Sequence, residues 1–195
     1  MAGMTPEIAM RQRIMDHAQA LVQTSGFDGF SFADVAGLVG IRKASIHHHF
    51  PTKADLGLRL IERFRGECRT RLAAIEADPD PTARLLGYIA MFRETLESGR
   101  MCLCGILAAG FGNLPDPIRV EVAAAFEEQV GWVARVIADG RDRGDFRPGG
   151  AALDQARSLV SGLEGAMLLA RVQGETGHFE SVARSLLGGL VAPGP

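Results

Sequence analysis

Apolar residues recur at helical spacing along most of the chain. Near the start they fall at i, i+4, i+7 and i+8, at Ile14, Ala18, Leu21 and Val22. A second stripe steps by four residues from Leu56 to Leu72. No run alternates apolar and polar residues with the β-branched enrichment that is typical of a strand. The pattern therefore predicts an all-α fold.

Capping residues, prolines and glycines divide this pattern into separate helices. Thr5-Pro6-Glu7 is typical of a helix start and Gly26 of a helix end. Ser31 with Asp34, and Thr52 with Asp55, have the spacing of capping boxes. Together these signals predict helices at about residues 6–25, 31–38, 43–49, 52–77, 82–97, 101–111, 116–137, 152–174 and 179–190, with a glycine-rich connector at 140–150.

The most informative stretch is residues 31–50, which reads SFADVAGLVGIRKASIHHHF. A helix-turn-helix needs a small residue where its two helices touch and favours a glycine in the turn, and here these are Ala36 and Gly40. It also needs apolar anchors on both helices, which are Val35, Ile41 and Ile46. On spacing alone, an ordinary pair of packed helices is an equal alternative.

The second helix of this pair carries polar side chains that suit DNA. Lys43 and the helix ends suit phosphate groups, while Ser45, His47 and His48 can hydrogen-bond to base edges or to the DNA backbone. Three adjacent histidines on a helix lie about 100° apart, so they do not converge on one ion. We therefore expect no metal site here.

Composition and charge narrow the class of protein. The 195 residues are 47% hydrophobic, which excludes a disordered chain, and the net charge of −2 excludes a generally basic nucleic-acid binder. Residues 1–71 nevertheless hold ten Lys and Arg against seven Asp and Glu. The longest apolar run, 101–111, is too short to span a membrane, so we expect a cytoplasmic protein without membrane partners.

Motifs for catalysis or cofactor binding are not found in the sequence. It holds no glycine-rich phosphate loop, nucleophile motif or paired carboxylates, so neither enzyme activity nor a cofactor is expected. A thiol-dependent enzyme that uses Cys102 is the remote alternative. The three cysteines imply no disulfide framework.

The stretch from Gly26 to Leu56 resembles the N-terminal domain of the tetracycline-repressor-like (TetR/AcrR) regulators. The matching features are the glycine after the first helix, the Ser31 cap, the Ala36 and Gly40 pair, the His49-Phe50 ending, and Lys53 at the start of the next helix. The specific resemblance covers about residues 7–60, and beyond that it extends to length and helical architecture.

This resemblance implies a homodimeric repressor that a small-molecule effector releases from a palindromic DNA operator. It implies a helix-turn-helix domain at residues 1–53 and an effector and dimerisation domain at 54–195, with 54–77 as the connecting helix. The expected DNA-binding residues are Ser31, Arg42, Lys43, Ala44, Ser45, His47, His48 and Lys53. In the family, the lysine at the position of Lys53 contacts phosphate. His47 stands where the family has a tyrosine, and Arg42 where it has a small capping residue.

A stripe of small residues predicts how two copies pair. Ser158, Gly162, Ala166 and Ala170 step by four residues, so a partner helix could approach closely. Together with the helices of residues 118–137, the two copies would form a four-helix bundle across a two-fold axis. Packing of these residues within one subunit is the alternative.

The effector site is predicted from apolar residues between the central helices. Its candidates are Tyr88, Phe92, Cys102, Ile106, Phe111 and Trp132, which suit an apolar or aromatic molecule. The segment GRMCLCGILAA also resembles the region of the reactive cysteine in the electrophile-sensing branch of the family, typified by the N-ethylmaleimide repressor. On that resemblance Cys102, with Cys104 beside it, is a thiol sensor. Two cysteines packed in an apolar helix are the alternative.

Overall fold

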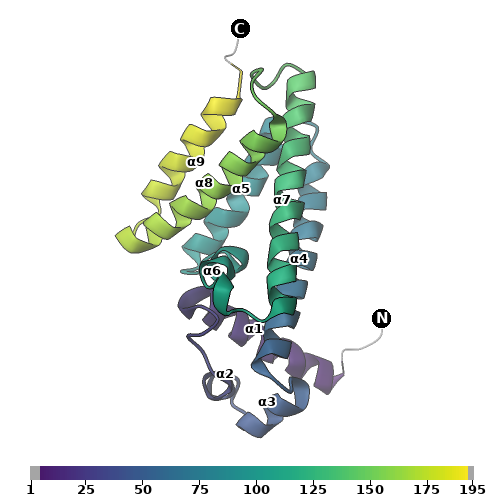
Figure 1. Cartoon of the computed structure of the whole chain (residues 1–195), viewed down its shortest axis with the longest axis vertical. Helices are drawn as coiled ribbons and strands as arrows, with labels where there is room; N and C mark the ends of the chain where they lie inside the picture. Colours follow the sequence, from purple (N-terminus) through teal and green to yellow (C-terminus); the bar gives the residue numbers. More distant parts are fainter. Residues whose placement is uncertain (1–4, 193–195) are drawn as a thin grey trace. The chain divides into compact units, whose positions relative to one another are not determined.

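The computed structural model describes residues 5–192, and over that range its regular elements are helical (Figure 1). The elements are α1 Pro6–Ser25, α2 Phe32–Val39, α3 Lys43–His49, α4 Lys53–Glu76, α5 Pro81–Glu97, α6 Leu103–Ala109, η1 Phe111–Asn113 (a 3-10 turn), α7 Asp116–Asp142, α8 Ala152–Gln173 and α9 Gly177–Leu190. The all-α prediction is confirmed. Within the described residues, none of the helices is both long and apolar enough to cross a membrane.

The helix caps that the sequence predicts are present. Each cap is a contact between residues three positions apart in the chain, so it does not depend on the rest of the fold. The Thr5 hydroxyl accepts a hydrogen bond from the Ile8 amide at 3.3 Å. Thr52 and Asp55 bond reciprocally, with the Asp55 amide 3.1 Å from the Thr52 hydroxyl and the Thr52 amide 2.9 Å from the Asp55 carboxylate. Asp80 caps α5, which therefore begins at Pro81, one residue before the predicted start.

The predicted connector at 140–150 begins too early, because α7 continues to Asp142. Gly140 lies inside the helix, and its lack of a side chain has a packing reason. A Cβ at this position would lie 2.3 Å from Cδ2 of Phe146, a ring that is 3% exposed. The glycine therefore makes room for a buried ring of the following loop instead of ending the helix.

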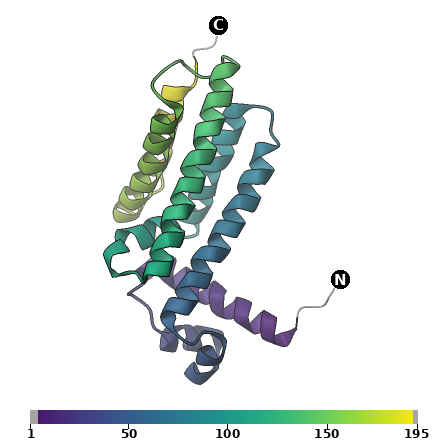
Figure 2. The ribbon, with the colours of Figure 1, turned by 45° about the vertical axis from the view of Figure 1, so that its right-hand side comes forward.

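The described chain forms two compact units, and the long helices α4 and α7 contribute to both. The first unit contains the chain up to Gly66 together with Leu103–Ala123, and the second contains Glu67–Cys102 and the chain from Ala124 onward. In both views α4 and α7 run side by side (Figures 1 and 2), and in the second unit Arg69 makes two hydrogen bonds to Glu128, at 3.0 and 3.1 Å.

Each unit has its own apolar core. The fully buried residues of the first unit come from α1, α2, α3, α4, α6 and α7, and include Ile14, Ala18, Val22, Val35, Ile46, Leu56, Ile61, Leu103 and Ile118. In the second unit Tyr88 packs between two other rings, with centroids 5.2 Å from Phe92 and 5.8 Å from Trp132. The Tyr88 hydroxyl donates to Gln129 Oε1 at 3.0 Å, so this buried polar pair is satisfied.

The stripe of small residues on α8 packs mainly within the chain, which was the alternative interpretation. A Cβ on Gly162 would lie 2.7 Å from Leu186 of α9, and Ala166 and Ala170 are buried. The reason is geometric: a step of four residues turns a helix by about 400°, so three steps carry the stripe about 120° around α8. Side chains that follow one another by alternating steps of three and four residues stay on one face of a helix. On α8 such a series is open to solvent, and its members are Ser158, Ser161, Gly165, Leu168 and Val172.

Gly140→Ala should lower the free energy of unfolding by about 1–3 kcal/mol, because the new methyl group overlaps the Phe146 ring. The matched control is Gly131→Ala in the same helix. Its added Cβ meets only Arg135 Nη1, at 3.8 Å, so it should raise the free energy of unfolding by roughly 0.5–1 kcal/mol. Urea unfolding of both variants measures this difference, and a shift of the same sign and size in both would contradict the packing role of Gly140.

Candidate nucleic-acid interface

Two short helices of the first unit, α2 and α3, are joined by the turn that the sequence predicts. Gly40 ends α2 in the left-handed conformation, with φ 76° and ψ 36°, and its amide donates to the Ala36 carbonyl at 2.9 Å. At the other end of α2, the Ser31 hydroxyl and the Ser31 amide both donate to the Asp34 carboxylate, at 2.8 and 2.7 Å, and these hydrogen bonds lower the pKa of Asp34. Val35, Ala36 and Ile46 are buried between the helices. The arrangement is a helix-turn-helix.

The outer face of α3 carries most of the residues predicted to meet DNA. It is formed by exposed side chains on both sides of the buried anchor Ile46, and these are Arg42, Lys43, Ala44, Ser45, His47 and His48. Ser31 is also exposed, at the start of α2. Arg42 precedes α3 without a side-chain hydrogen bond to the helix, as expected from its replacement of a small capping residue. The structure thus brings the α3 candidates together on one surface.

His47 has a fixed ring orientation. Its Nδ1 lies 3.1 Å from the Pro51 carbonyl oxygen, and its ring packs edge-on against Phe32 with centroids 4.9 Å apart. Because a carbonyl oxygen only accepts hydrogen bonds, Nδ1 is the protonated nitrogen of this contact. The opposite nitrogen, Nε2, is then the one left without this carbonyl contact.

Two arginines of α1, which the sequence analysis did not single out, support the ends of α2 and α3. Arg13 Nη2 donates to the carbonyl of Val39, the last residue of α2, at 3.1 Å. Arg11 Nη1 donates to the carbonyl of His49, the last residue of α3, at 3.4 Å, and its guanidinium lies 4.6 Å above the ring of Phe50. Cations at helix C-termini compensate the helix dipole. Only the folded arrangement of α1 against α2 and α3 reveals this role.

The side chain of Lys53 contacts two phenylalanines of the first unit. Its Nζ donates to the Phe30 carbonyl at 2.7 Å and lies 4.5 Å from the centroid of the Phe30 ring and 5.0 Å from that of Phe27. Partial burial lowers the pKa of Lys53, while the charges of Asp28 and Asp34 oppose that shift. An ammonium group has three N–H donors, and the carbonyl uses one of them. Lys53 therefore ties the start of α4 to the loop before α2 and keeps donors for another acceptor.

The six residues predicted to line an effector site are divided between the two units. Ile106 and Phe111 belong to the first unit, where Phe111 is 42% exposed. The other four belong to the second unit, where Tyr88, Phe92 and Trp132 pack against one another and Cys102 is buried. No group of side chains in residues 5–192 has the composition and geometry of a metal site.

All three cysteines are buried, and none of them forms a disulfide. Burial, aided by the nearby Cys102, raises the pKa of Cys68 to about 12. Cys102 is hydrogen-bonded to Glu164 of α8, a residue that the sequence analysis did not single out. A thiolate is favoured by cations and helix N-termini and disfavoured by burial and by a neighbouring carboxylate, so these surroundings favour the neutral thiol of Cys102.

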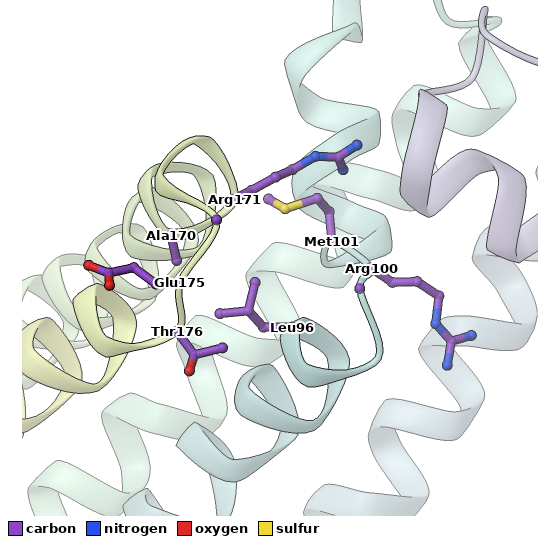
Figure 3. A pocket seen from close by; sticks show the side chains of 9 residues that line it. Leu96, Arg100, Met101, Ala170, Arg171, Glu175 and Thr176 are labelled. Carbon is purple, nitrogen blue, oxygen red and sulfur yellow. The ribbon is translucent and has the colours of Figure 1, made fainter.

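A pocket of about 230 Å³ lies in the second unit between the end of α5, the loop before α6 and the end of α8 (Figure 3). Apolar side chains of Leu96, Met101 and Ala170 line it, whereas the side chain of Arg100 points away from its middle (Figure 3). The complete lining is Leu96, Gly99, Arg100, Met101, Ala170, Arg171, Gly174, Glu175 and Thr176. This pocket shares no residue with the predicted effector set, although Met101 is the chain neighbour of Cys102.

A glycine-turned helix pair with a polar, exposed second helix defines a helix-turn-helix DNA-binding protein. Residues 14–60 match the family described as "Bacterial regulatory proteins, tetR family", and residues 81–186 match "Tetracyclin repressor-like, C-terminal domain". The chain belongs to the TetR family of DNA-binding transcriptional regulators and is not an enzyme.

Similar proteins extend over both matched regions. The chain is 25% identical over 166 residues to the HTH-type transcriptional repressor DhaR of Mycobacterium sp. (strain GP1), which covers 84% of this chain and 83% of the repressor. The crystal structure of a TetR-family transcriptional regulator from Agrobacterium tumefaciens superposes with a TM-score of 0.92 at 32% identity, covering 95% of this chain and 100% of that one.

The electrophile-sensing branch is represented among more distant relatives. The Escherichia coli (strain K12) repressor NemR is 22% identical over 170 residues, which cover 83% of this chain and 84% of NemR. The crystal structure of its reduced form superposes with a TM-score of 0.81 at 20% identity over 95% of this chain and 100% of that one, a likeness that extends to the fold alone. Membership of that branch stays a prediction.

Lys53→Ala should lower the free energy of unfolding by about 1–2 kcal/mol, because the Phe30 carbonyl loses a charged donor and two rings lose their cation. Lys43→Ala is the control, since it removes an exposed lysine of the same unit and should change stability by less than about 0.5 kcal/mol. Thermal unfolding of the two variants provides the comparison. Equal stability of both would show that the Phe30 contact contributes nothing.

Proposed function

We propose that this chain is a homodimeric repressor that a small-molecule effector releases from a palindromic operator. The observation that carries the proposal is the exposed polar face of α3, held by a glycine turn in a chain of the TetR family. The similarity to DhaR, which is named a repressor, favours repression over activation.

The proposed DNA contacts divide by chemistry. Arg42, Lys43 and the remaining donors of Lys53 would bind phosphate, and so would the free amides at the start of α2 beside Ser31. Ser45, His47 and His48 would reach base edges, and the methyl group of Ala44 suits contact with a thymine methyl. In this proposal residues 1–53 bind DNA, 54–77 connect, and the remainder up to 195 binds the effector and the second copy; residues 1–4 and 193–195 lie outside the described residues.

The open stripe of α8 supports the proposed dimer. Small residues occupy its first half, and Leu168 and Val172, which are 48% and 84% exposed, occupy its second half beside the exposed Leu169. Apolar side chains at steps of three and four residues pack well against a symmetry-related helix. A dimer also presents two recognition helices at the spacing of about 34–36 Å that a palindromic site requires.

A noncovalent effector is the version of the proposal that we favour. The pocket lined by Leu96, Met101 and Ala170 supplies an apolar site, whereas the buried thiol of Cys102 beside Glu164 is a poor nucleophile. Release requires only that the effector bind better to the form that cannot hold DNA. A tenfold loss of DNA affinity corresponds to about 1.4 kcal/mol of coupling.

Binding to the DNA upstream of its own coding region tests the proposal. The purified chain should bind this DNA specifically over competitor DNA. The double variant Ser45→Ala/His48→Ala should lose that preference without losing its fold, because both side chains are exposed and are proposed to reach base edges. Binding that is unaffected by the double variant would exclude α3 as the reading helix.

The phosphate contacts make a quantitative prediction for the salt dependence. Lys43→Ala and Lys53→Ala should each weaken binding to all DNA sequences and reduce the slope of log K against log salt concentration by about 0.9. Arg135→Ala, which removes an exposed cation of the second unit, should leave that slope unchanged. Titrations at several salt concentrations measure the slope, and an unaltered value for Lys53→Ala would remove Lys53 from the proposed interface.

The dimer makes a separate prediction. Val172→Glu places a charge in the proposed helix contact and should convert a dimer into a monomer, with a loss of operator affinity of at least about tenfold. Leu86→Glu is the matched control, because Leu86 is 47% exposed on α5, outside the proposed interface. Analytical ultracentrifugation gives the oligomeric state, and dimers of unchanged stability in Val172→Glu would exclude this face.

A further inference from the structure

The three adjacent histidines that end α3 differ in how their rings are held. Two contacts fix the ring of His47: its Nδ1 lies 3.1 Å from the Pro51 carbonyl oxygen, and its edge packs against Phe32 with ring centroids 4.9 Å apart. The ring of His48 packs against that of His49 at 5.5 Å, and both belong to α3 itself. The ring of His47 is therefore held from outside its own helix, by α2 and by the turn before α4.

The Pro51 carbonyl also decides which nitrogen of His47 carries hydrogen. A carbonyl oxygen only accepts hydrogen bonds, so the hydrogen of the neutral ring stays on Nδ1 and Nε2 keeps a lone pair. Turning the ring over would exchange the two nitrogens but would break this contact. Nε2 of His47 thus donates a hydrogen bond only after the ring has taken up a second proton.

This nitrogen belongs to an exposed side chain on the outer face of α3, the second helix of the helix-turn-helix. DNA presents mainly acceptors to such a helix, which are the phosphate oxygens, guanine N7 and O6, and thymine O4. The lone pair of the neutral ring repels each of these acceptors, and only the amino groups of adenine and cytosine suit it. A protonated ring instead offers the acceptors an N–H donor and a positive charge.

The charged groups on the neighbouring elements do not supply a partner for a protonated ring. On α3, Lys43 lies one turn before His47 and is itself a cation. The carboxylates of Asp34 on α2 and Asp55 on α4 accept hydrogen bonds in their capping boxes, and Lys53 donates to a backbone carbonyl. Within residues 5–192 the His47 ring forms no ion pair. An acceptor that stabilises its protonated form therefore has to come from the DNA.

We propose that His47 is a proton-dependent DNA contact. On binding, the ring takes up one proton from solvent at Nε2, and the new N–H donates to an acceptor of the DNA, while Nδ1 keeps its bond to Pro51. Phosphate oxygens and the acceptor atoms of guanine and thymine share this chemistry. The inference rests on the proposed function, because it needs the outer face of α3 to meet DNA.

The pH dependence of DNA affinity tests the proposal. The full chain is titrated with its upstream DNA and with unrelated competitor DNA at fixed salt, from about pH 8 to about pH 5.5. Because binding takes up a proton, the affinity should rise as the pH falls through the range in which histidine titrates. The expected gain is at least about tenfold, the size of one charge-assisted hydrogen bond.

Two adjacent variants assign the effect to one ring. His47→Gln cannot take up a proton in this range, so most of the gain at low pH should disappear. His48→Gln is the matched control, since this exposed ring is not tied to a carbonyl and can donate from either nitrogen while it is neutral. Whatever its effect on affinity, His48→Gln should keep the gain. A gain that survives in His47→Gln, or that disappears only in His48→Gln, would overturn the proposal.

Calorimetry measures the proton directly. Near neutral pH, the apparent heat of DNA binding should change with the ionisation enthalpy of the buffer, and the change should correspond to an uptake of up to about one proton per chain at His47. This part of the uptake should be absent in His47→Gln and present in His48→Gln. Equal proton uptake by the unaltered chain and His47→Gln would contradict the assignment.

The two kinds of DNA identify the acceptor. If Nε2 donates to a phosphate, the gain at low pH should be the same for upstream and competitor DNA. If it donates to guanine or thymine, the gain should be larger for the upstream DNA and should vanish when the contacted base pair is changed. Either result supports the proton-dependent contact, whereas an affinity for both DNAs that is independent of pH rejects it.

The same titrations separate this inference from the proposed function. If Ser45→Ala/His48→Ala loses the preference for upstream DNA but His47→Gln keeps the full pH dependence, α3 reads the DNA and only the role of His47 is overturned. If the chain binds DNA at no pH in the range, both proposals fail.

Discussion

A helix of seven residues does not persist in water, and everything that this protein does with DNA depends on holding such a helix in place. The sequence of α3 offers only one fully buried side chain, Ile46, so its stability comes from its neighbours. The left-handed turn at Gly40 sets the direction in which the chain enters α3. The C-terminal end of α3 is held by the buried ring of Phe50 and by the hydrogen bond from Arg11 to the His49 carbonyl. Because these contacts lie at the buried side and the two ends of α3, its outer face is left to exposed, mostly polar residues.

Holding α3 and its neighbours in place also occupies several positively charged side chains with contacts inside the protein. The ten Lys and Arg of residues 1–71 suggest a basic surface, but several bind groups of the protein itself. Arg13 and Lys53 donate to backbone carbonyls, and Arg63 pairs with Asp16 at 2.6 Å. The cations of the helix-turn-helix that point freely outward are those at the start of α3. Counting charge along the sequence therefore overestimates the surface available to phosphate, and the location of the charges on α3 is the more informative quantity.

The sequence predicts this fold well wherever a feature depends on residues close together in the chain. Capping boxes at Ser31 and Thr52 and the glycine turn at Gly40 are of this kind, and so is the exposed face of α3. Features that depend on distant residues escape such reasoning. Gly140 reads as a helix end until Phe146 is found against it, and the partner of Gly162 is Leu186 of the next helix.

In the second unit, the candidate thiol sensor lies beside a buried acid. A thiol sensor reacts through the anion of Cys102, and this thiol is hydrogen-bonded to Glu164. Two adjacent buried anions repel strongly, so forming one opposes forming the other. A carboxyl group ionises more readily than a thiol, so a negative charge at this pair forms first on Glu164. The hydrogen bond between Cys102 and Glu164 therefore opposes the thiol-sensor hypothesis and supports the proposed noncovalent effector.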